Sequence, residues 1–273
     1  MKAVKTILGT LLLCLLTLQV QAADKEQQID TILEQSGFNK LLQHVPDFAQ
    51  AVLKQSSGAL EPEINSALSA VFQDAFATDA VRQGVIEVID AHYDESRANT
   101  YIQQLNSPLS RRMTELERTT TNPANADDFR AFASALEKTP PPESRSQLIK
   151  RLDQANRTTE FSIDMQTAFF KAIFVAMDPV MDADMRLAEG ELDKMVDEVH
   201  NSLDKSLRKN TRLAYLYAFR KTSDKELESY IEMCETDSYR WAIQMLANAM
   251  ISALSEAADH AAEAMSAAAH SKK

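Results

Sequence analysis

Glycine is scarce in this sequence, with 5 residues in a chain of 273, about 2% where about 7% is usual. Glycine supplies the positive-φ turns of β-hairpins and of phosphate-binding loops, so its scarcity argues against a β-sandwich, a barrel or a dinucleotide-binding fold. Hydrophobic residues make up 45% of the chain and charged residues 25%, the balance of a folded protein rather than a disordered or fibrous one. The composition therefore predicts a folded chain with few strands.

Cysteine is equally rare, because only Cys14 and Cys234 occur. Cys14 lies inside an apolar N-terminal run and is preceded by leucines rather than small residues, so we expect it to be removed with a leader rather than to carry a lipid anchor. Cys234 then has no partner for an intramolecular disulfide. About 250 remaining residues suffice to bury a substantial core, so packing must supply the stability.

Recognisable catalytic motifs are also lacking. The sequence has no Gly-x-Ser-x-Gly elbow, no His-Glu-x-x-His pair, no phosphate-binding loop and no Cys-x-x-Cys pair, which are the local signatures of common hydrolases, metalloproteases, nucleotide-binding proteins and redox proteins. We therefore predict a protein that is not an enzyme and that needs no metal or other cofactor.

Residues 1–22 have the features of a cleavable signal peptide. Lys2 and Lys5 are followed by an apolar run from residue 7 to 16, and Val20-Gln21-Ala22 fits the cleavage pattern. We therefore expect the mature chain to start at Ala23 and to be periplasmic. No later run of about 18 apolar residues could span a bilayer.

The mature chain is strongly acidic. Without Lys2 and Lys5 it has 27 basic residues against 40 acidic ones, a formal charge of −13. Such a charge repels nucleic acids and anionic membrane surfaces, so neither is an expected partner.

Helical periodicity dominates from Asp24 to His270. Apolar residues recur at three- and four-residue spacing, as at Ile29, Ile32 and Leu33, and no sustained alternation of period two occurs. Breakers fall at the ends of these segments, among them Gly37, Pro108, Pro123 and Pro179. Ser107-Pro108 and the stretch Ser223 to Glu226 are helix-start signals. We predict an all-α bundle of about ten helices.

Two related halves flank a proline-rich hinge at residues 139–142. Residues 23–138 and 143–270 resemble each other at two places, where Leu33-Glu34-Gln35 matches Leu152-Asp153-Gln154 and residues 101–107 match residues 230–236. The offsets are 119 and 129 residues, so the second copy contains about ten additional residues. The pattern predicts an internal duplication.

The matching segments carry a resemblance to a bacterial family called domain-of-unknown-function two-thousand-and-fifty-nine. They share an aliphatic-aromatic helix, a Ser-Pro step and a basic pair. The residues concerned are Tyr101, Ile102, Leu105, Ser107, Pro108, Arg111 and Arg112, with a degenerate copy at Leu227, Tyr230, Ile231, Thr236 and Arg240. The resemblance implies an exported, all-helical protein of unassigned activity and transfers no catalytic residue.

Charged clusters have simple explanations. Asp197 with His200, and Glu256 with His260, share helix faces but lack the further ligands of a di-iron site. The acidic run from Asp178 to Glu191 departs from the spacing of a calcium-binding loop. We interpret these clusters as paired or solvated surface charges.

Methionines and a long last helix are the remaining candidates for a functional surface. Thioethers recurring every four residues suit core packing, a pliable partner-binding face or Cu(I). The candidate partner-binding residues are Met177, Met181, Met185, Met250 and Met265. The last helix, from Trp241 to about residue 269, has a stripe of small residues whose end past His260 could dock a partner helix or be frayed and solvated.

Two functions remain open. The first is a protein-binding or accessory module that acts on an unknown periplasmic protein, with an undetermined oligomeric state. The alternative is a carrier of an apolar small molecule or lipid in a cavity between the halves. A hydrolase would require clustered catalytic groups that the sequence does not display.

Overall fold

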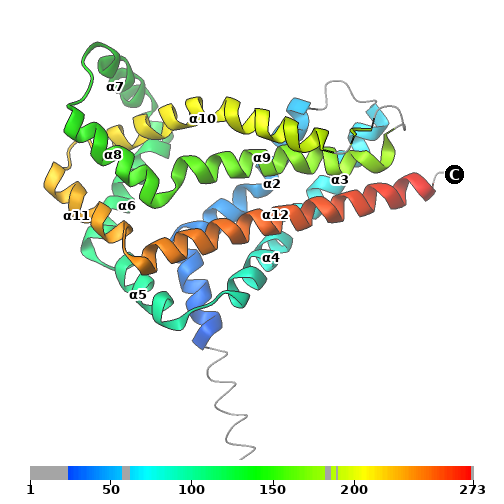
Figure 1. Cartoon of the computed structure of the whole chain (residues 1–273), viewed down its shortest axis with the longest axis horizontal. Helices are drawn as coiled ribbons and strands as arrows, with labels where there is room; N and C mark the ends of the chain where they lie inside the picture. The colour runs from blue at the N-terminus through cyan, green and yellow to red at the C-terminus, as the bar shows by residue number, and fades with distance from the viewer. Residues whose placement is uncertain (1–23, 57–61, 182–185, 189, 272–273) are drawn as a thin grey trace, which may run out of the picture.

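The computed structural model describes residues 24–56, 62–181, 186–188 and 190–271, so the predicted signal peptide lies outside the described residues. Every regular element in these ranges is a helix (Figure 1). The all-α prediction is confirmed, with twelve α-helices where about ten were expected. In chain order they are α1 (residues 24–35), α2 (Phe38–Ser56), α3 (Pro62–Ala75), α4 (Thr78–Ala91), α5 (Glu95–Leu105), α6 (Pro108–Thr121), α7 (Ala126–Lys138), α8 (Glu143–Asn156), α9 (Thr158–Met177), α10 (Glu191–Ala218), α11 (Asp224–Cys234) and α12 (Asp237–Ser271), with short 3₁₀ helices at Pro123–Asn125 and Asp178–Val180.

Helix α12 is the central element of the bundle. It runs along α9 and contacts α3, α4 and α5 over its length (Figure 1). Its small-residue stripe is buried, and Ala261 and Met265 are only 0% and 2% exposed. One face of this helix past His260 therefore packs against its own chain through Ala261 and Met265, whereas Glu263 and Ala264 are exposed.

A glycine allows α4 to approach α12 closely. A Cβ atom at Gly84 would lie 3.1 Å from the Cβ of Ala253, tighter than most side-chain contacts. Small residues on facing helices permit this short interaxial distance. The alanine stripe of α12 therefore serves packing within the bundle.

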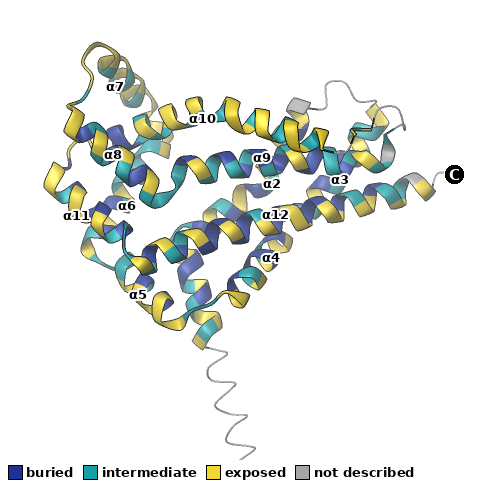
Figure 2. Cartoon of the chain, in the orientation of Figure 1, coloured by how far each residue is buried: buried dark blue, intermediate teal, exposed yellow. Residues whose placement is uncertain are grey.

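The two sequence halves share one hydrophobic core. The same cluster of buried residues includes Leu33, Phe72 and Tyr101 from the first half and Phe169, Phe219 and Leu246 from the second. Helix α7, which precedes the proline-rich hinge, stands at the periphery, and α10 is largely exposed until its last four residues (Figure 2). The duplication is therefore folded into a shared core.

The repeat is visible in the helix boundaries. Helices α5 and α11 have the same length, and the starts of α11 and α12 lie 129 residues after those of α5 and α6. Asp94 accepts a hydrogen bond from the amide of Arg97 at the start of α5, and Ser223 accepts one from that of Glu226 at the start of α11. The two copies thus use the same N-cap position.

In the first copy, the helix that follows α5 is capped as predicted at its start. Ser107 accepts a hydrogen bond from the amide of Ser110, and Pro108 occupies the first turn of α6. In the second copy the hydroxyl of Thr236 donates to the carbonyl of Met233 and accepts from Nε2 of Gln104 at 2.8 Å. The second corner therefore ties the two copies together.

Membrane-spanning character was examined in the same ranges. None of the helices that the structure describes combines the length and the apolar character that crossing a bilayer requires.

Candidate functional site

A cavity of about 170 Å³ lies where the two halves meet. Helices from both halves contribute to its walls, and the exposed side chain of Gln35 lies at its edge. The lining residues are Gln35, Ser36, Phe38, Tyr101, Leu105, Ser110, Thr114, Glu117, Asn156, Phe161, Tyr230, Tyr239, Ile243, Leu246 and Ala247.

Helices α6 and α12 contribute side chains of different polarity to this cavity. Ser110, Thr114 and Glu117 lie on one face of α6, because they follow the spacing of successive helical turns. The residues 129 positions later, Tyr239, Ile243 and Leu246, line the cavity from α12. The duplicated helices therefore face the same space with different chemistry, and the only carboxylate among the lining residues is Glu117.

Glu117 is held in an environment that favours its neutral form. Its Oε1 atom is enclosed and has no hydrogen-bond partner. Removal from water raises the pKa of Glu117 from 4.5 to about 7, although a hydrogen bond with Tyr230 opposes the shift. The carboxyl group consequently titrates close to neutral pH, a property common among functional residues.

Two tyrosines connect Glu117 to the second copy. Tyr239 hydrogen-bonds Tyr230, whose own hydroxyl bonds Glu117. Burial raises the pKa of both tyrosines well above the usual value, so both hydroxyls remain neutral donors. Burial also raises the pKa of the Cys234 thiol to about 12, which leaves it protonated and a poor nucleophile.

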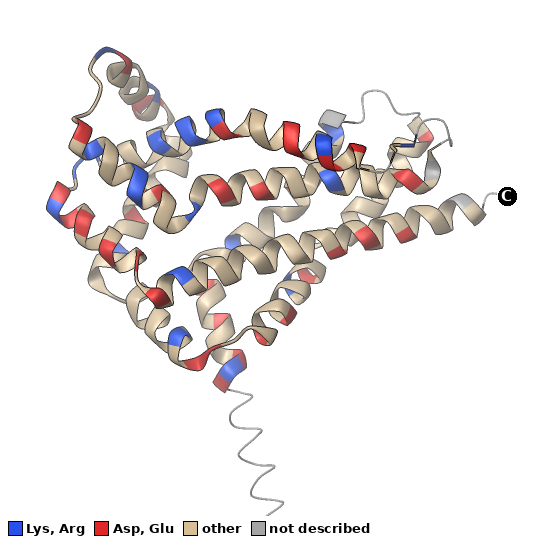
Figure 3. Ribbon diagram, in the orientation of Figure 1, with Lys and Arg blue, Asp and Glu red and all other residues tan. Residues whose placement is uncertain are grey.

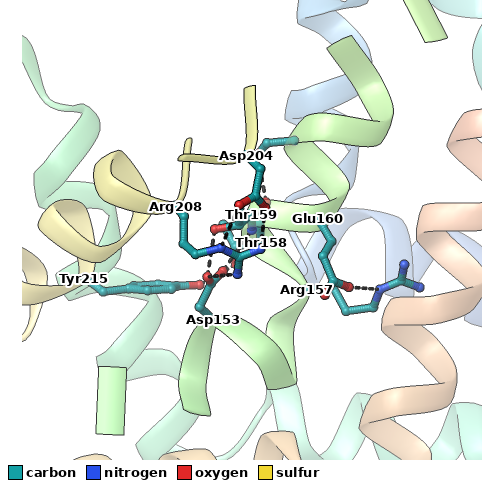
Figure 4. A network of polar contacts seen from close by, with 9 residues as sticks. Asp153, Arg157, Thr158, Thr159, Glu160, Asp204, Arg208 and Tyr215 are labelled. Carbon is teal, nitrogen blue, oxygen red and sulfur yellow. Dashed lines mark hydrogen bonds and ion pairs between the residues drawn. The ribbon is translucent and has the colours of Figure 1, made fainter. Parts of the chain in front are cut away.

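The corner between α8 and α9 positions another polar group at the cavity. Asp153 accepts hydrogen bonds from the amide of Thr159 at 2.9 Å and from its hydroxyl at 2.7 Å (Figure 4). Between the helices, Arg157 adopts a left-handed conformation with φ of 52°, which is strained for a residue with a side chain. These contacts fix the end of α8, where Asn156 is located.

Asn156 uses one of its two polar atoms within the protein. Its Nδ2 donates to the hydroxyl of Tyr215 at 3.2 Å, and that hydroxyl lies 2.6 Å from the hydroxyl of Thr158. Its Oδ1 is enclosed without a hydrogen-bond partner. Glu117 and Asn156, which both line the cavity, thus each have one enclosed oxygen without a hydrogen-bond partner.

Two of the five methionines predicted to form a partner-binding face do not reach the surface. Met250 and Met265 are buried in the core, so that part of the prediction is wrong: the small-residue stripe of α12 turns both thioethers inward. Met177 and Met181 are half-buried. Met185 lies outside the described residues.

Clusters suited to a metal were also sought. In the ranges given above, no three His, Cys, Asp or Glu side chains converge to hold an ion. His260 Nε2 lies 3.8 Å from Glu256 Oε1, which agrees with their interpretation as a surface charge pair. Much of the acidic run from Asp178 to Glu191 lies outside the described residues.

A second hollow is a groove of about 860 Å³ between α3, α4 and the C-terminal half of α12. Alanines and Gly84 contribute much of its surface. Its lining includes four carboxylates and no lysine or arginine, and Figure 3 shows acidic positions on α4 and on this part of α12. The carboxylates belong to Asp74, Glu87, Glu256 and Glu263.

Motif searching along the chain does not detect the cavity. Glu117 occurs in an ordinary polar helix, and Asn156 ends another. The available signal was the internal repeat, because extending the 129-residue offset aligns Glu117 with Leu246. In this alignment of two amphipathic helices, a carboxylate in one copy corresponds to a leucine in the other, which marks a position where the two copies differ in chemistry.

Neither a protein family, nor a curated protein, nor a solved structure matches this chain. The resemblance noted from the motifs at residues 101–112 and 227–240 thus stays a prediction.

Proposed function

We propose that the chain is an exported binding protein that holds a small polar molecule in the cavity between its halves. The observation that supports this role is a cavity whose lining includes the Glu117 carboxyl group and the Asn156 amide, each with one enclosed oxygen that lacks a partner. Leaving a buried acceptor unpaired costs about 1–3 kcal/mol. Leucine occupies the equivalent position of α12, so the helical scaffold alone does not require a carboxylate at position 117.

The dimensions of the cavity limit the ligand. An apolar cavity of about 150 Å³ in another protein accommodates benzene, and the present cavity is about 170 Å³. Pockets for drug-sized ligands usually exceed about 300 Å³. The apolar or lipid carrier considered from the sequence would place its ligand at the same junction, but size and polarity favour a small molecule with hydrogen-bonding groups.

Binding rather than catalysis is the role that these groups support. Cys234 is buried and its thiol pKa is raised to about 12, and the tyrosines remain protonated. Glu117 can accept a hydrogen bond or a proton, but no paired nucleophile faces it from the lining residues. This arrangement is suited to holding a ligand.

The test is a fragment screen by NMR against the mature protein, with Ser110→Leu as a cavity-filling variant. Ser110 is 2% exposed and lines the cavity, so a larger side chain there reduces the available volume. Fragments of up to about ten heavy atoms should shift the resonances of the lining residues, and Ser110→Leu should abolish this response.

Ser96→Leu is the matched control, because Ser96 is exposed on α5 and does not line the cavity. It should bind fragments as the unaltered protein does. The proposal fails if no fragment binds at 10 mM, on the order of the weakest affinity useful for such small ligands, or if Ser110→Leu folds and binds them normally.

Protein binding is a second candidate, favoured by the acidic groove on α3, α4 and α12. Its small residues allow close approach of a helix backbone, and its carboxylates are complementary to a basic segment. A lysine-rich helical peptide should bind at low ionic strength, and the double variant Glu256→Gln, Glu263→Gln should weaken it several-fold. Equal binding of a glutamate-rich peptide would exclude this candidate.

A further inference from the structure

Some hydrogen-bonding groups of the residues around the cavity have partners within the protein, and others have none. The Tyr239 hydroxyl bonds Tyr230, and that of Tyr230 bonds Glu117. The Nδ2 group of Asn156 donates to Tyr215. The enclosed atoms left without partners, Glu117 Oε1 and Asn156 Oδ1, are both acceptors when the carboxyl group is ionised. The ionised carboxylate of Glu117 is only an acceptor, so a ligand that pairs with it in the cavity must bring hydrogen-bond donors.

The charge of the lining points to the same chemistry. Glu117 is its only ionisable carboxylate, and no lysine, arginine or histidine lines the cavity to balance it. Three tyrosines, Tyr101, Tyr230 and Tyr239, contribute aromatic side chains to the walls. Aromatic groups with a carboxylate are a common means of binding organic cations, because the ring face carries partial negative charge.

We propose that the cavity binds a small organic ammonium ion, whose charge pairs with the Glu117 carboxylate. This inference rests on the proposed function and names the class of its ligand. The cavity volume restricts the ion to about the size of a benzene ring. The apolar wall of Ile243, Leu246 and Ala247 would contact its hydrocarbon part.

Several groups surround Glu117 and bear on its titration. Tyr215 approaches from α10, Tyr230 and Cys234 from α11, and Tyr239 from α12, and burial raises the pKa of each. Arg112 on α6 is engaged with Glu226 at 2.7 Å, outside the lining. Glu117 is therefore the group in this cluster that changes charge between pH 6 and pH 8, with its pKa of about 7.

The experiment compares n-butylamine, n-butanol and n-butyrate, which differ mainly in the charge of one end. Affinities are measured by NMR titration at pH 8 and pH 6 with the mature protein and with Glu117→Gln. At pH 8 the amine should bind at least tenfold more tightly than the alcohol, and butyrate should not bind. Its affinity should fall about tenfold at pH 6, where Glu117 is mostly neutral while the amine stays charged.

Glu117→Gln should weaken amine binding at least tenfold, remove its pH dependence and leave butanol binding within twofold. Glu115→Gln is the matched control, since the Glu115 side chain is 72% exposed on the same helix, and it should have no effect. If butanol and the amine bind equally and Glu117→Gln changes neither, the ammonium assignment is wrong while the proposed function stands. If none of the three binds and the fragment screen is also negative, both are wrong.

Discussion

Helix α6 and the first half of α12 are counterparts in the duplication, yet they present different side chains to the same cavity. Ser110 and Glu117 on α6 correspond to Tyr239 and Leu246 on α12. Both helices follow an eleven-residue helix that begins with a side-chain N-cap. The backbone arrangement is therefore repeated, whereas polarity is confined to one copy. This difference shows that the polar wall is not a requirement of the fold.

The most severe test of this comparison is to make both walls acidic. The side chain of Leu246 is only 3% exposed. Leu246→Glu would therefore place a second carboxylate in the cavity, where no basic lining residue could pair with it. Unpaired buried charge and repulsion from Glu117 should reduce the free energy of unfolding at pH 8 by about 4 kcal/mol. Urea denaturation would measure this loss, which should be smaller at pH 5, where both carboxyl groups can be protonated.

Leu246→Met is the control for the volume change and should lower stability by no more than about 1.5 kcal/mol. A Leu246→Glu protein as stable as Leu246→Met at pH 8 would contradict the enclosed position of residue 246.

The next largest effect is expected from making both walls apolar. The pKa of Glu117 is about 7 in the folded chain and 4.5 in the unfolded one, so the folded state retains a proton that the unfolded state has lost. Stability therefore declines as pH rises from about 4.5 to about 7, by up to about 3 kcal/mol. Glu117→Leu removes this loss.

We therefore expect Glu117→Leu to increase the free energy of unfolding at pH 8 far more than at pH 4.5. Urea titrations across this range would measure the difference. Glu115→Leu, at an exposed position, should produce no such dependence on pH. A Glu117→Leu gain that is equal at both pH values would show that ionisation of this carboxyl group does not limit stability.

Removing the N-cap side chain at the same position of each copy should reduce stability by similar amounts. Asp94 and Ser223 cap equivalent helices through equivalent hydrogen bonds. Asp94→Ala and Ser223→Ala should each cost about 1 kcal/mol, with thermal unfolding as the readout. Values that differ by more than a factor of three would indicate that the caps are not equivalent in energy.

The smallest effect on stability is expected at the turn between the first two helices of each half, which are α1 and α2 in the first and α8 and α9 in the second. The first copy has Gly37 at a φ of 80°, and the second copy has Arg157 at 52°. Arg157→Gly relieves backbone strain of about 1–2 kcal/mol. It also loses the ion pairs with Glu160 and Asp164, 3.2 and 3.8 Å away, and a hydrogen bond to Gln244, and exposed ion pairs are worth about 0–1 kcal/mol each. We expect a gain of about 1 kcal/mol or less in the free energy of unfolding. A loss exceeding 1 kcal/mol would show that the arginine side chain holds the corner.

Local signals explain which parts of this fold the sequence reveals. The cap at Ser107 with Pro108, the capping of α11 by Ser223 and the period of the apolar residues are all properties of neighbouring residues, and each is confirmed. The methionines show the limit of such signals. Their spacing indicates one helix face, but whether that face is covered depends on α12 packing against distant helices, which buries Met250 and Met265.

The amino-acid sequence by itself determines that this chain is helical, because helix periodicity, caps and proline breaks act over a few residues, and it predicts that the two halves are related. Only the tertiary structure decides that Glu117, Asn156 and the tyrosines of two copies meet around one cavity. Burial is a collective property of packed helices, and it is burial that moves the pKa of Glu117 to about 7. The same glutamate on an exposed helix face would be an ordinary surface charge.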